Sequence, residues 1–144
     1  MQLDWAMMAE AVQIRDGLAF VLGGGFDTVV TAQLPATLRG AVAIRVLFHR
    51  TEVDREHAIE VRVLDEDGGE LLRLHSHFKP GIPDDLPLGW DVPLLVTFAI
   101  PQLGLPRAGS YSVEVLGNGS HLKSLNLRVR LLTSVQTNPS ASSR

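Results

Sequence analysis

Apolar and polar residues alternate with a period of two over most of this chain, which is typical of β-strands that bury one face. The clearest example is residues 42–50, where Val42, Ile44, Val46 and Phe48 form one apolar face. The same pattern predicts strands over residues 57–65, 72–78, 94–100, 110–116 and 121–132. Turn-forming residues such as Asn118-Gly119 separate these segments. The pattern therefore predicts an all-β protein.

The first part of the chain predicts a hairpin. Residues 3–14 fit the spacing of a helix and of a strand equally well. Arg15-Asp16-Gly17 contains the Asp-Gly pair of tight hairpin turns, and Leu18–Leu22 is an apolar, strand-like run. We therefore expect a hairpin that joins residues 5–14 to residues 18–22.

Three consecutive glycines, Gly23, Gly24 and Gly25, follow this hairpin and precede Phe26. Glycine-rich turns can bind phosphate when a helix follows them. Here no Lys-Ser or Lys-Thr pair follows, and residues 26–31 are aromatic and β-branched, as in strands. We therefore expect a structural bend, where one long strand passes from one sheet to the other and Phe26 anchors it.

About eight to nine short strands without a convincing helix predict an antiparallel β-sandwich with Greek-key-like connections. A closed barrel is the alternative. Strand 94–100 is apolar on both faces, which predicts a central strand, and Pro101 predicts a corner after it. We expect a single domain over residues 1–133 and a disordered tail over residues 134–144, where the apolar pattern ends.

Composition narrows the classes of function. The chain has no cysteine, so disulfides, thiolate metal sites and cysteine nucleophiles are excluded. The net charge is −3 and the 13 Lys and Arg residues are scattered, which predicts no nucleic-acid partner. The start of the chain shows no signal peptide, and no apolar run reaches the ~18 residues of a membrane span. We expect a cytoplasmic protein without a membrane partner.

Several short segments occur together in this chain. They are Leu3-Asp4-Trp5-Ala6, Asp16-Gly17, Gly23-Gly24-Gly25-Phe26, Leu64-Asp65-Glu66-Asp67-Gly68 and Pro106-Arg107-Ala108-Gly109-Ser110-Tyr111. Over residues 3–131 the chain resembles an uncharacterised bacterial domain-of-unknown-function family of small all-β proteins. The resemblance implies a fold, and it carries over no activity and no catalytic residue.

His75 and His77 have the spacing of a strand-borne metal pair, because residues i and i+2 point to the same side. They could share Zn²⁺ with a third ligand, for which His49, His57 and Glu56 are candidates. The competing interpretation is a solvated strand face, which we favour because only two ligands are local. No cofactor is expected.

Two acidic loops offer a second metal hypothesis. One contains Asp65, Glu66 and Asp67, and the other contains Asp84 and Asp85 with Asp91 beside it. Some β-sandwiches hold Ca²⁺ between loops of this kind. Acidic residues are also ordinary in turns, which we consider the better explanation.

No enzyme class is favoured. A serine hydrolase needs a nucleophile, a positioned histidine and an acid, and no Gly-x-Ser-x-Gly motif is present. No catalytic residue is predicted.

Binding is the leading hypothesis. The proline-rich segment 79–90 is long for a connection in a small domain, and it ends at Trp90. Leu47, Leu64 and Leu95 are predicted on the outward faces of their strands. Outward apolar residues indicate either a partner or a covering segment. The sequence thus favours a non-enzymatic interaction or assembly module that binds itself or another protein. The alternative is a metal- or small-ligand-binding protein that uses His75 and His77 or the acidic loops.

Overall fold

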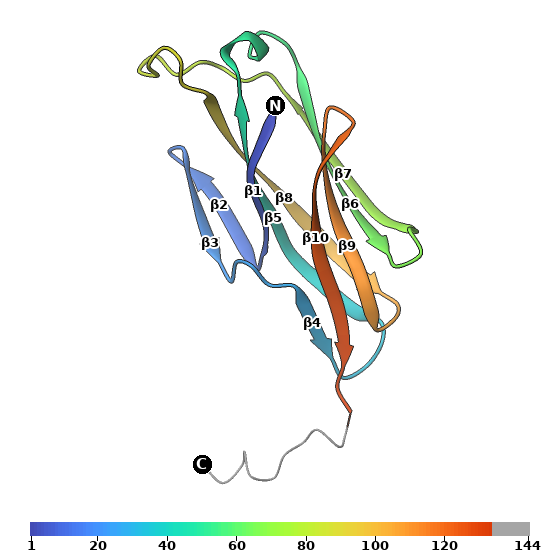
Figure 1. Cartoon of the computed structure of the whole chain (residues 1–144). Coiled ribbons are helices and arrows are strands. Elements are labelled where there is room, and N and C mark those ends of the chain that lie inside the picture. Colours follow the sequence, from blue (N-terminus) through green and yellow to red (C-terminus); the bar gives the residue numbers. More distant parts are fainter. Residues whose placement is uncertain (134–144) are drawn as a thin grey trace, which may run out of the picture.

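The computed structural model describes residues 1–133 of the 144-residue chain, so the tail predicted over 134–144 lies outside the described residues. Figure 1 shows an elongated body of strands. The strands are β1 (Gln2–Ala9), β2 (Ala11–Arg15), β3 (Leu18–Leu22), β4 (Thr28–Thr31), β5 (Ala36–Phe48), β6 (His57–Asp65), β7 (Glu70–Phe78), β8 (Val92–Leu105), β9 (Gly109–Gly117) and β10 (Ser120–Leu131). A single 3-10 turn, η1 (Arg50–Glu52), is the one helical element in this range. Across residues 1–133 we find no helix with the length and hydropathy to cross a membrane.

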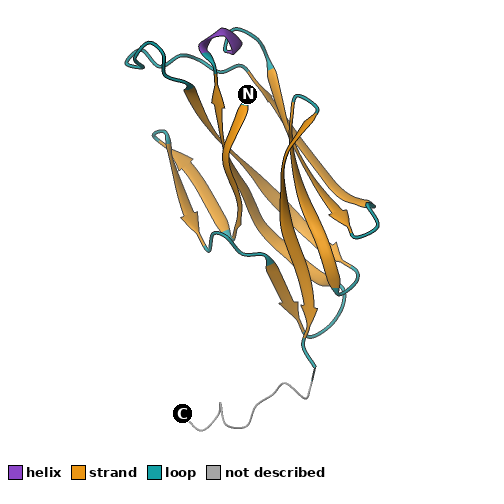
Figure 2. Ribbon diagram, in the orientation of Figure 1, coloured by secondary structure: helices purple, strands orange, loops and turns teal. Residues whose placement is uncertain are grey.

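Two sheets pack face to face and confirm the antiparallel β-sandwich (Figure 2). The small sheet has the order β1-β5-β8, and the large sheet has the order β4-β10-β9-β6-β7. All pairings are antiparallel except that of β4 with β10. Alternate residues of β5, β6, β9 and β10 fill the space between the sheets. The predicted alternation is confirmed, since Ile59, Val61 and Val63 are fully buried.

The connection from β8 to β9 is closed by a tyrosine. Tyr111 is buried, and its hydroxyl donates to the carbonyl of Arg107 at 2.8 Å while it accepts from the Arg107 N–H at 3.0 Å. A hydrogen-bonded tyrosine at this corner is a feature of immunoglobulin-like sandwiches. The placement of β1, β5 and β8 in one sheet and β6, β9 and β10 in the other agrees with that architecture.

The predicted hairpin is present, but its first arm is shorter than expected. The β2–β3 ribbon turns at Asp16-Gly17, whose φ angles of 54° and 73° suit a tight hairpin turn. The strand is interrupted at Glu10, and residues 2–9 pair with β5 instead of β3. Residues 5–14 are therefore two strands, because the apolar period fits either partner and does not show which sheet each half joins.

The ribbon lies against the outer side of the small sheet, where β2 contacts β5 and β8. Ala41 and Ala43 project to that side of β5, and both are buried. Their burial shows that the ribbon covers part of the small sheet and forms a local third layer.

The glycine triplet is a loop, so the expected bend within one long strand is wrong. β3 ends at Leu22 and β4 begins at Thr28, which places residues 23–27 between the ribbon and the large sheet. Gly23 and Gly25 have φ angles of 62° and 86°, in the region that favours glycine. Phe26 packs against the core, as an anchor would. The passage of the chain from one sheet to another was expected at these glycines. The positive φ angles of Gly23 and Gly25 explain why the chain makes this passage in a loop and not within a continuous strand.

Gly24→Val is expected to lower the melting temperature. A Cβ at this position would lie 2.7 Å from Cγ1 of Val21 and 3.0 Å from Sδ of Met7. Overpacking of this kind costs about 1–3 kcal/mol. Thermal unfolding followed by circular dichroism measures the effect. Gly81→Val is the control, because a Cβ at Gly81 meets nothing within 4 Å. Equal melting temperatures for the two variants would contradict the packing seen at Gly24.

Strand β8 is an edge strand, which corrects the prediction that it is central. It pairs only with β5 in the small sheet. Both faces are apolar because the inward side meets the core while the ribbon lies against the outward side. Instead of the expected corner at Pro101, β8 continues through a register shift. The shift lies between Ile100 and Leu103, which pair with Gly40 and Leu38 of β5. Proline is tolerated at a bulge on an edge strand, where its missing N–H costs no hydrogen bond between strands.

Candidate functional site

The β2–β3 ribbon presents apolar side chains on both of its faces. Ala19 and Val21 are half-buried, while Leu18, Phe20 and Leu22 keep 60, 47 and 70% of their surface exposed. These three residues share one face because side chains alternate along a strand. Single exposed apolar residues are normal on soluble proteins, but a contiguous group marks a candidate interaction site.

The backbone of β3 also has an open edge, because the ribbon has only two strands. The turn pairs Arg15 with Leu18. Hydrogen-bonded and non-hydrogen-bonded pairs alternate from there, so Leu18, Phe20 and Leu22 direct their N–H and C=O groups at β2. Ala19 and Val21 direct theirs away from β2. Four backbone groups of β3 therefore point to the open edge.

This edge is unprotected, in contrast to the other sheet edges within residues 1–133. Soluble proteins protect edge strands with charges, prolines or short length. The edge strand β1 carries Asp4, β2 carries Arg15, β7 carries Arg73 and His75, β8 carries Pro93 and Pro101, and β4 has only four residues. The five residues of β3 are all apolar. The ribbon thus combines an open backbone edge with an exposed apolar face.

The proline-rich loop, residues 79–91, is held at its base by Arg50. The guanidinium of Arg50 donates to the carbonyl of Leu86 at 2.6 Å and to that of Pro87 at 2.8 Å. The Leu86 side chain packs against the core. The loop is therefore fixed at residues 86–87, and its other apolar side chains are left at the surface.

Those side chains are Ile82, Leu88 and Trp90, which are 42, 89 and 63% exposed. The loop and the ribbon border one mainly apolar hollow of about 330 Å³ on the outside of β8. Its lining residues are Ile14, Gly17, Arg45, Pro83, Pro93, Leu94 and Leu95. We call Leu18, Phe20, Leu22, Ile82, Leu88 and Trp90 the ribbon-and-loop surface.

Arg50→Ala is expected to release the loop, because residues 86 and 87 lose their charge-assisted hydrogen bonds. Backbone amides of the loop should exchange with solvent at least about tenfold faster, since one such bond contributes about 1.5–3 kcal/mol. Hydrogen exchange measured by mass spectrometry tests this. Arg39→Ala, at an exposed position outside the loop, is the control. Unchanged exchange in the loop would show that the arginine does not hold it.

The predicted binding residues do not form one surface. Trp90 is exposed in the loop, as expected. Leu47 and Leu95 project from the outer side of the small sheet, where the ribbon lies, and both are only half-buried. Leu64 belongs to β6 in the large sheet, and is also half-buried. Leu18, Phe20, Leu22, Ile82 and Leu88 were missed. The all-apolar run after an Asp-Gly turn was the available signal for the first three.

His75 and His77 lie side by side on β7 and are exposed, with ring centroids 5.7 Å apart. Glu56 is 3.4 Å from Nδ1 of His77. Within residues 1–133, no three His, Cys, Asp or Glu side chains are arranged to hold a metal ion. Of the other suggested ligands, His57 is 2% exposed and faces the core. The metal hypothesis stays a prediction that rests on two local ligands.

The two acidic loops lie at opposite ends of the sandwich. The first follows the end of β6. The second precedes β8, which begins at the same end of the sandwich as β6 (Figure 1). In the first loop, one carboxylate oxygen of Asp65 accepts from the N–H groups of Asp67 and Gly69. Arg107 lies 3.5 Å from Asp67. These carboxylates are engaged in turn and ion-pair contacts, as ordinary turn residues are.

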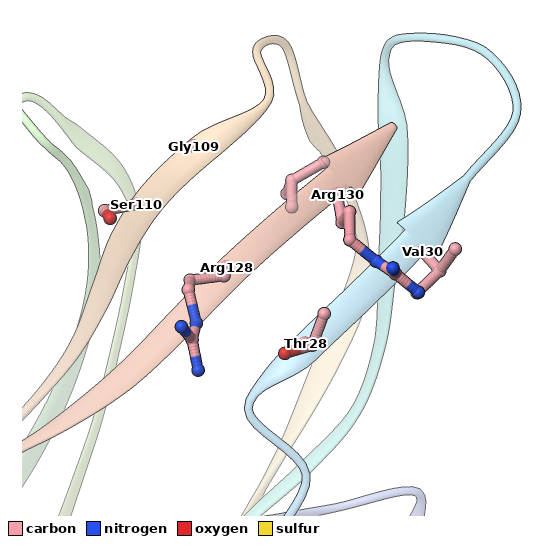
Figure 3. A pocket seen from close by; sticks show the side chains of 7 residues that line it. Thr28, Val30, Gly109, Ser110, Arg128 and Arg130 are labelled. Atoms are coloured by element: carbon pink, nitrogen blue, oxygen red, sulfur yellow. The ribbon is translucent and has the colours of Figure 1, made fainter. Parts of the chain in front are cut away.

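A larger open hollow of about 610 Å³ lies where β4, β10 and β9 meet (Figure 3). It is lined by Thr28, Val30, Gly109, Ser110, Arg128, Val129 and Arg130. Arg128 is 3.5 Å from Asp27, and Arg130 extends towards Val30 (Figure 3). Of its polar lining residues, Ser110, Arg128 and Arg130 are exposed and Thr28 is half-buried. It lacks the convergent buried polar groups that define a small-molecule site.

Glu114, His121 and Ser124 form a cluster on the outer face of the large sheet. Nε2 of His121 is 2.9 Å both from Glu114 and from the hydroxyl of Ser124. A catalytic triad uses one ring nitrogen for the serine and the other for the acid. Here one nitrogen meets both groups, so the cluster lacks the geometry of a hydrolase site. It joins β9 to β10.

Protein stability is expected to fall below about pH 4.5. Burial raises the pKa of Glu114, but hydrogen bonds from Ser124, His121 and Ser112 outweigh burial and hold it below its usual range. A hydrogen bond from Arg62, opposed by burial and supported by the nearby charge of Arg73, holds the pKa of Glu60 low. A lowered folded-state pKa stabilises the fold above the unfolded value, near 4.3, and this stabilisation is lost as pH falls.

The melting temperature measured from pH 3 to pH 7 tests this dependence. We expect Glu114→Gln to melt lower than wild type near pH 7 and to lose less on acidification. Glu66→Gln, at an exposed turn position, should follow the wild-type curve. An acid dependence unchanged in Glu114→Gln would show that this carboxylate does not contribute.

Comparison with known proteins adds a family and a distant structural neighbour. The model of a family described as "Family of unknown function (DUF6941)" matches residues 4–130. A solved structure of an immunoglobulin-like protein from Pseudomonas aeruginosa is 14% identical, with a TM-score of 0.37, and the match covers 90% of this chain and 95% of that one. No protein with a curated description matches the chain significantly. The predicted resemblance to a family of unknown function is thus confirmed, and its bacterial origin stays a prediction.

Proposed function

The chain belongs to DUF6941, a family of unknown function, and we propose that it is a non-enzymatic interaction or assembly module that binds protein through its ribbon-and-loop surface. The proposal concerns another protein or a second copy of the chain. It extends the sequence hypothesis. The half-buried Leu47, Leu64 and Leu95 are replaced as the main contacts by the more exposed residues of the ribbon-and-loop surface.

One observation supports the proposal above the others. Ten large apolar side chains are exposed within residues 1–133, and six of them form the ribbon-and-loop surface. The other four belong to the end of the sandwich where β4 and β10 finish. They are Val30, Leu34, Leu131 and Leu132. Apolar groups concentrated on two segments that border one hollow favour a docking surface over random exposure.

The chemistry of the described surface also supports the proposal. The Glu114 cluster lacks triad geometry, and His75 and His77 offer only two local ligands. Trp90 is the residue type most enriched among the dominant contacts of protein interfaces. A cytoplasmic location, and the absence of nucleic-acid and membrane partners, stay predictions from the sequence.

Affinity capture with quantitative mass spectrometry tests the proposal. The tagged chain is added to a lysate of its source organism that also contains the untagged chain. We expect at least one protein to be enriched by wild type and lost with Leu88→Ser/Trp90→Ser. The control is Val30→Ser/Leu132→Ser, which removes two exposed apolar residues at the other end. Enrichment that is identical for all three baits would contradict the proposed surface.

A further inference from the structure

The sequence of β3 is nearly the same read in either direction: Leu18-Ala19-Phe20-Val21-Leu22. Leucines occupy both ends, small aliphatic residues come next, and phenylalanine lies at the centre. We propose that β3 pairs antiparallel with β3 of a second copy about a two-fold axis at Phe20. The two ribbons then form a continuous four-stranded sheet. This inference rests on the proposed function and names its partner as a second copy of the chain.

The backbone fixes the register of this pairing. Only Ala19 and Val21 direct their N–H and C=O groups to the open edge. When Ala19 lies opposite Val21 of the second copy, both such pairs exchange two hydrogen bonds, which gives about four in all. A register that places Ala19 opposite Ala19, or Val21 opposite Val21, keeps only one pair. The two-fold at Phe20 is therefore the register that satisfies the whole edge.

The side chains fit the same register. Phe20 meets Phe20 of the second copy in a non-hydrogen-bonded pair, where side chains approach most closely. Leu18 lies opposite Leu22. Beyond them, Gly17 lies opposite Gly23, so no side chain obstructs the ends of the paired strands.

Charged residues lie near both ends of β3, on the far strand of the ribbon. Glu10 lies beside Gly23 at one end of β3, since a Cβ on Gly23 would meet Cγ of Glu10. Arg15 pairs with Leu18 at the other end, and its guanidinium lies 5.5 Å from the Phe20 ring centroid. In the antiparallel pairing, Arg15 and Leu18 of one copy lie in a row with Leu22 and Ala11 of the other, so Arg15 and Glu10 of the other copy stand about 14 Å apart across three strand spacings. The charges therefore form no contact across the pairing, and the self-complementary sequence of β3 is what favours a second copy.

The size of the contact predicts a weak dimer. Two five-residue strands bury on the order of a few hundred Å² per copy, below the ~800 Å² per partner of a standard interface. We therefore expect dissociation in the micromolar range or weaker, and a dimer that depends on concentration. A two-fold interface uses the same edge of both copies, so the assembly closes at two copies and forms no filament.

Single-cysteine variants test this pairing, because the chain contains no cysteine. Phe20→Cys should form a disulfide-linked dimer under mild oxidation, since the Cα atoms of such a pair lie ~4.5 Å apart, within the range of disulfides. Leu18→Cys and Leu22→Cys should not crosslink alone, because the Cα atom of each residue is about 14 Å from the Cα atom of the same residue in the second copy. A mixture of these two variants should crosslink. Non-reducing electrophoresis measures the products.

Leu132→Cys is the control for random collision, because Leu132 is an exposed apolar side chain outside the ribbon-and-loop surface. Phe20→Cys should crosslink at least about tenfold faster. Equal rates, or no product from Phe20→Cys, would overturn the pairing, as would crosslinking of Leu18→Cys alone. If capture of another protein through Leu88 and Trp90 succeeds while Phe20→Cys fails, the self-pairing is wrong and the proposed function stands. If crosslinking succeeds and all three baits capture only the untagged chain equally, the self-pairing stands and binding through Leu88 and Trp90 is wrong.

Discussion

Gly40→Val is expected to abolish soluble, folded protein. A Cβ at Gly40 would lie 2.4 Å from the carbonyl oxygen of Ala9, at the end of the pairing between β1 and β5. The φ angle of 138° is also one that L side chains rarely adopt. A backbone atom cannot yield as a flexible side chain can, so the cost is expected to exceed about 3 kcal/mol.

Soluble expression and denaturant unfolding measure this effect. Gly104→Ala is the matched control, because Gly104 lies on the neighbouring strand β8 and a Cβ there would be 3.9 Å from its nearest contact, Pro35. It should remain within about 1 kcal/mol of wild type. A Gly40→Val protein as stable as Gly104→Ala would show that β1 does not approach β5 as described.

His57→Ala is expected to destabilise the fold by about 3 kcal/mol, because it leaves a cavity and breaks two partly buried hydrogen bonds. Nε2 lies 2.6 Å from the carbonyl of Glu52, and Nδ1 lies 2.9 Å from the side-chain nitrogen of Asn118. The carbonyl only accepts, so Nε2 donates and Nδ1 accepts from Asn118. The ring also packs against Phe48 and Phe78.

His77→Ala is the comparison for this variant, since the same residue type is exposed there. It should change the free energy of unfolding by less than about 0.5 kcal/mol. Chemical denaturation of both variants provides the values. A similar loss at the two positions, or no loss at His57, would contradict the structural role of the buried ring.

Alternation of apolar residues was enough to predict the fold class, because one face of most strands meets the core. It located β6, β7 and β9 closely, where Ile59 and Val113 alternate with charged or polar neighbours. It failed where a strand has a second apolar layer. β8 was expected to be central because both faces are apolar, and the ribbon that lies against its outer face belongs to a distant part of the sequence.

The candidate site was only partly predictable. Trp90 in a proline-rich loop was found from composition and loop length. Leu18 and Phe20 were counted as an ordinary strand, because periodicity shows that a strand exists but not whether it lies at an edge. That information comes from the topology, which leaves β3 without a second neighbour. Outward-facing Leu64 is half-buried for a related reason, since neighbouring strands of the large sheet flank it.

Backbone hydrogen exchange of the wild-type chain across a concentration series tests the central claim most directly. If β3 pairs with a second copy, the amides of Ala19 and Val21 must slow as the concentration rises. The edge strand β7 has no role in the pairing, so the amides of its residues must keep their rates. Rates at Ala19 and Val21 that stay constant at every concentration, or slowing confined to another sheet edge, would contradict the account.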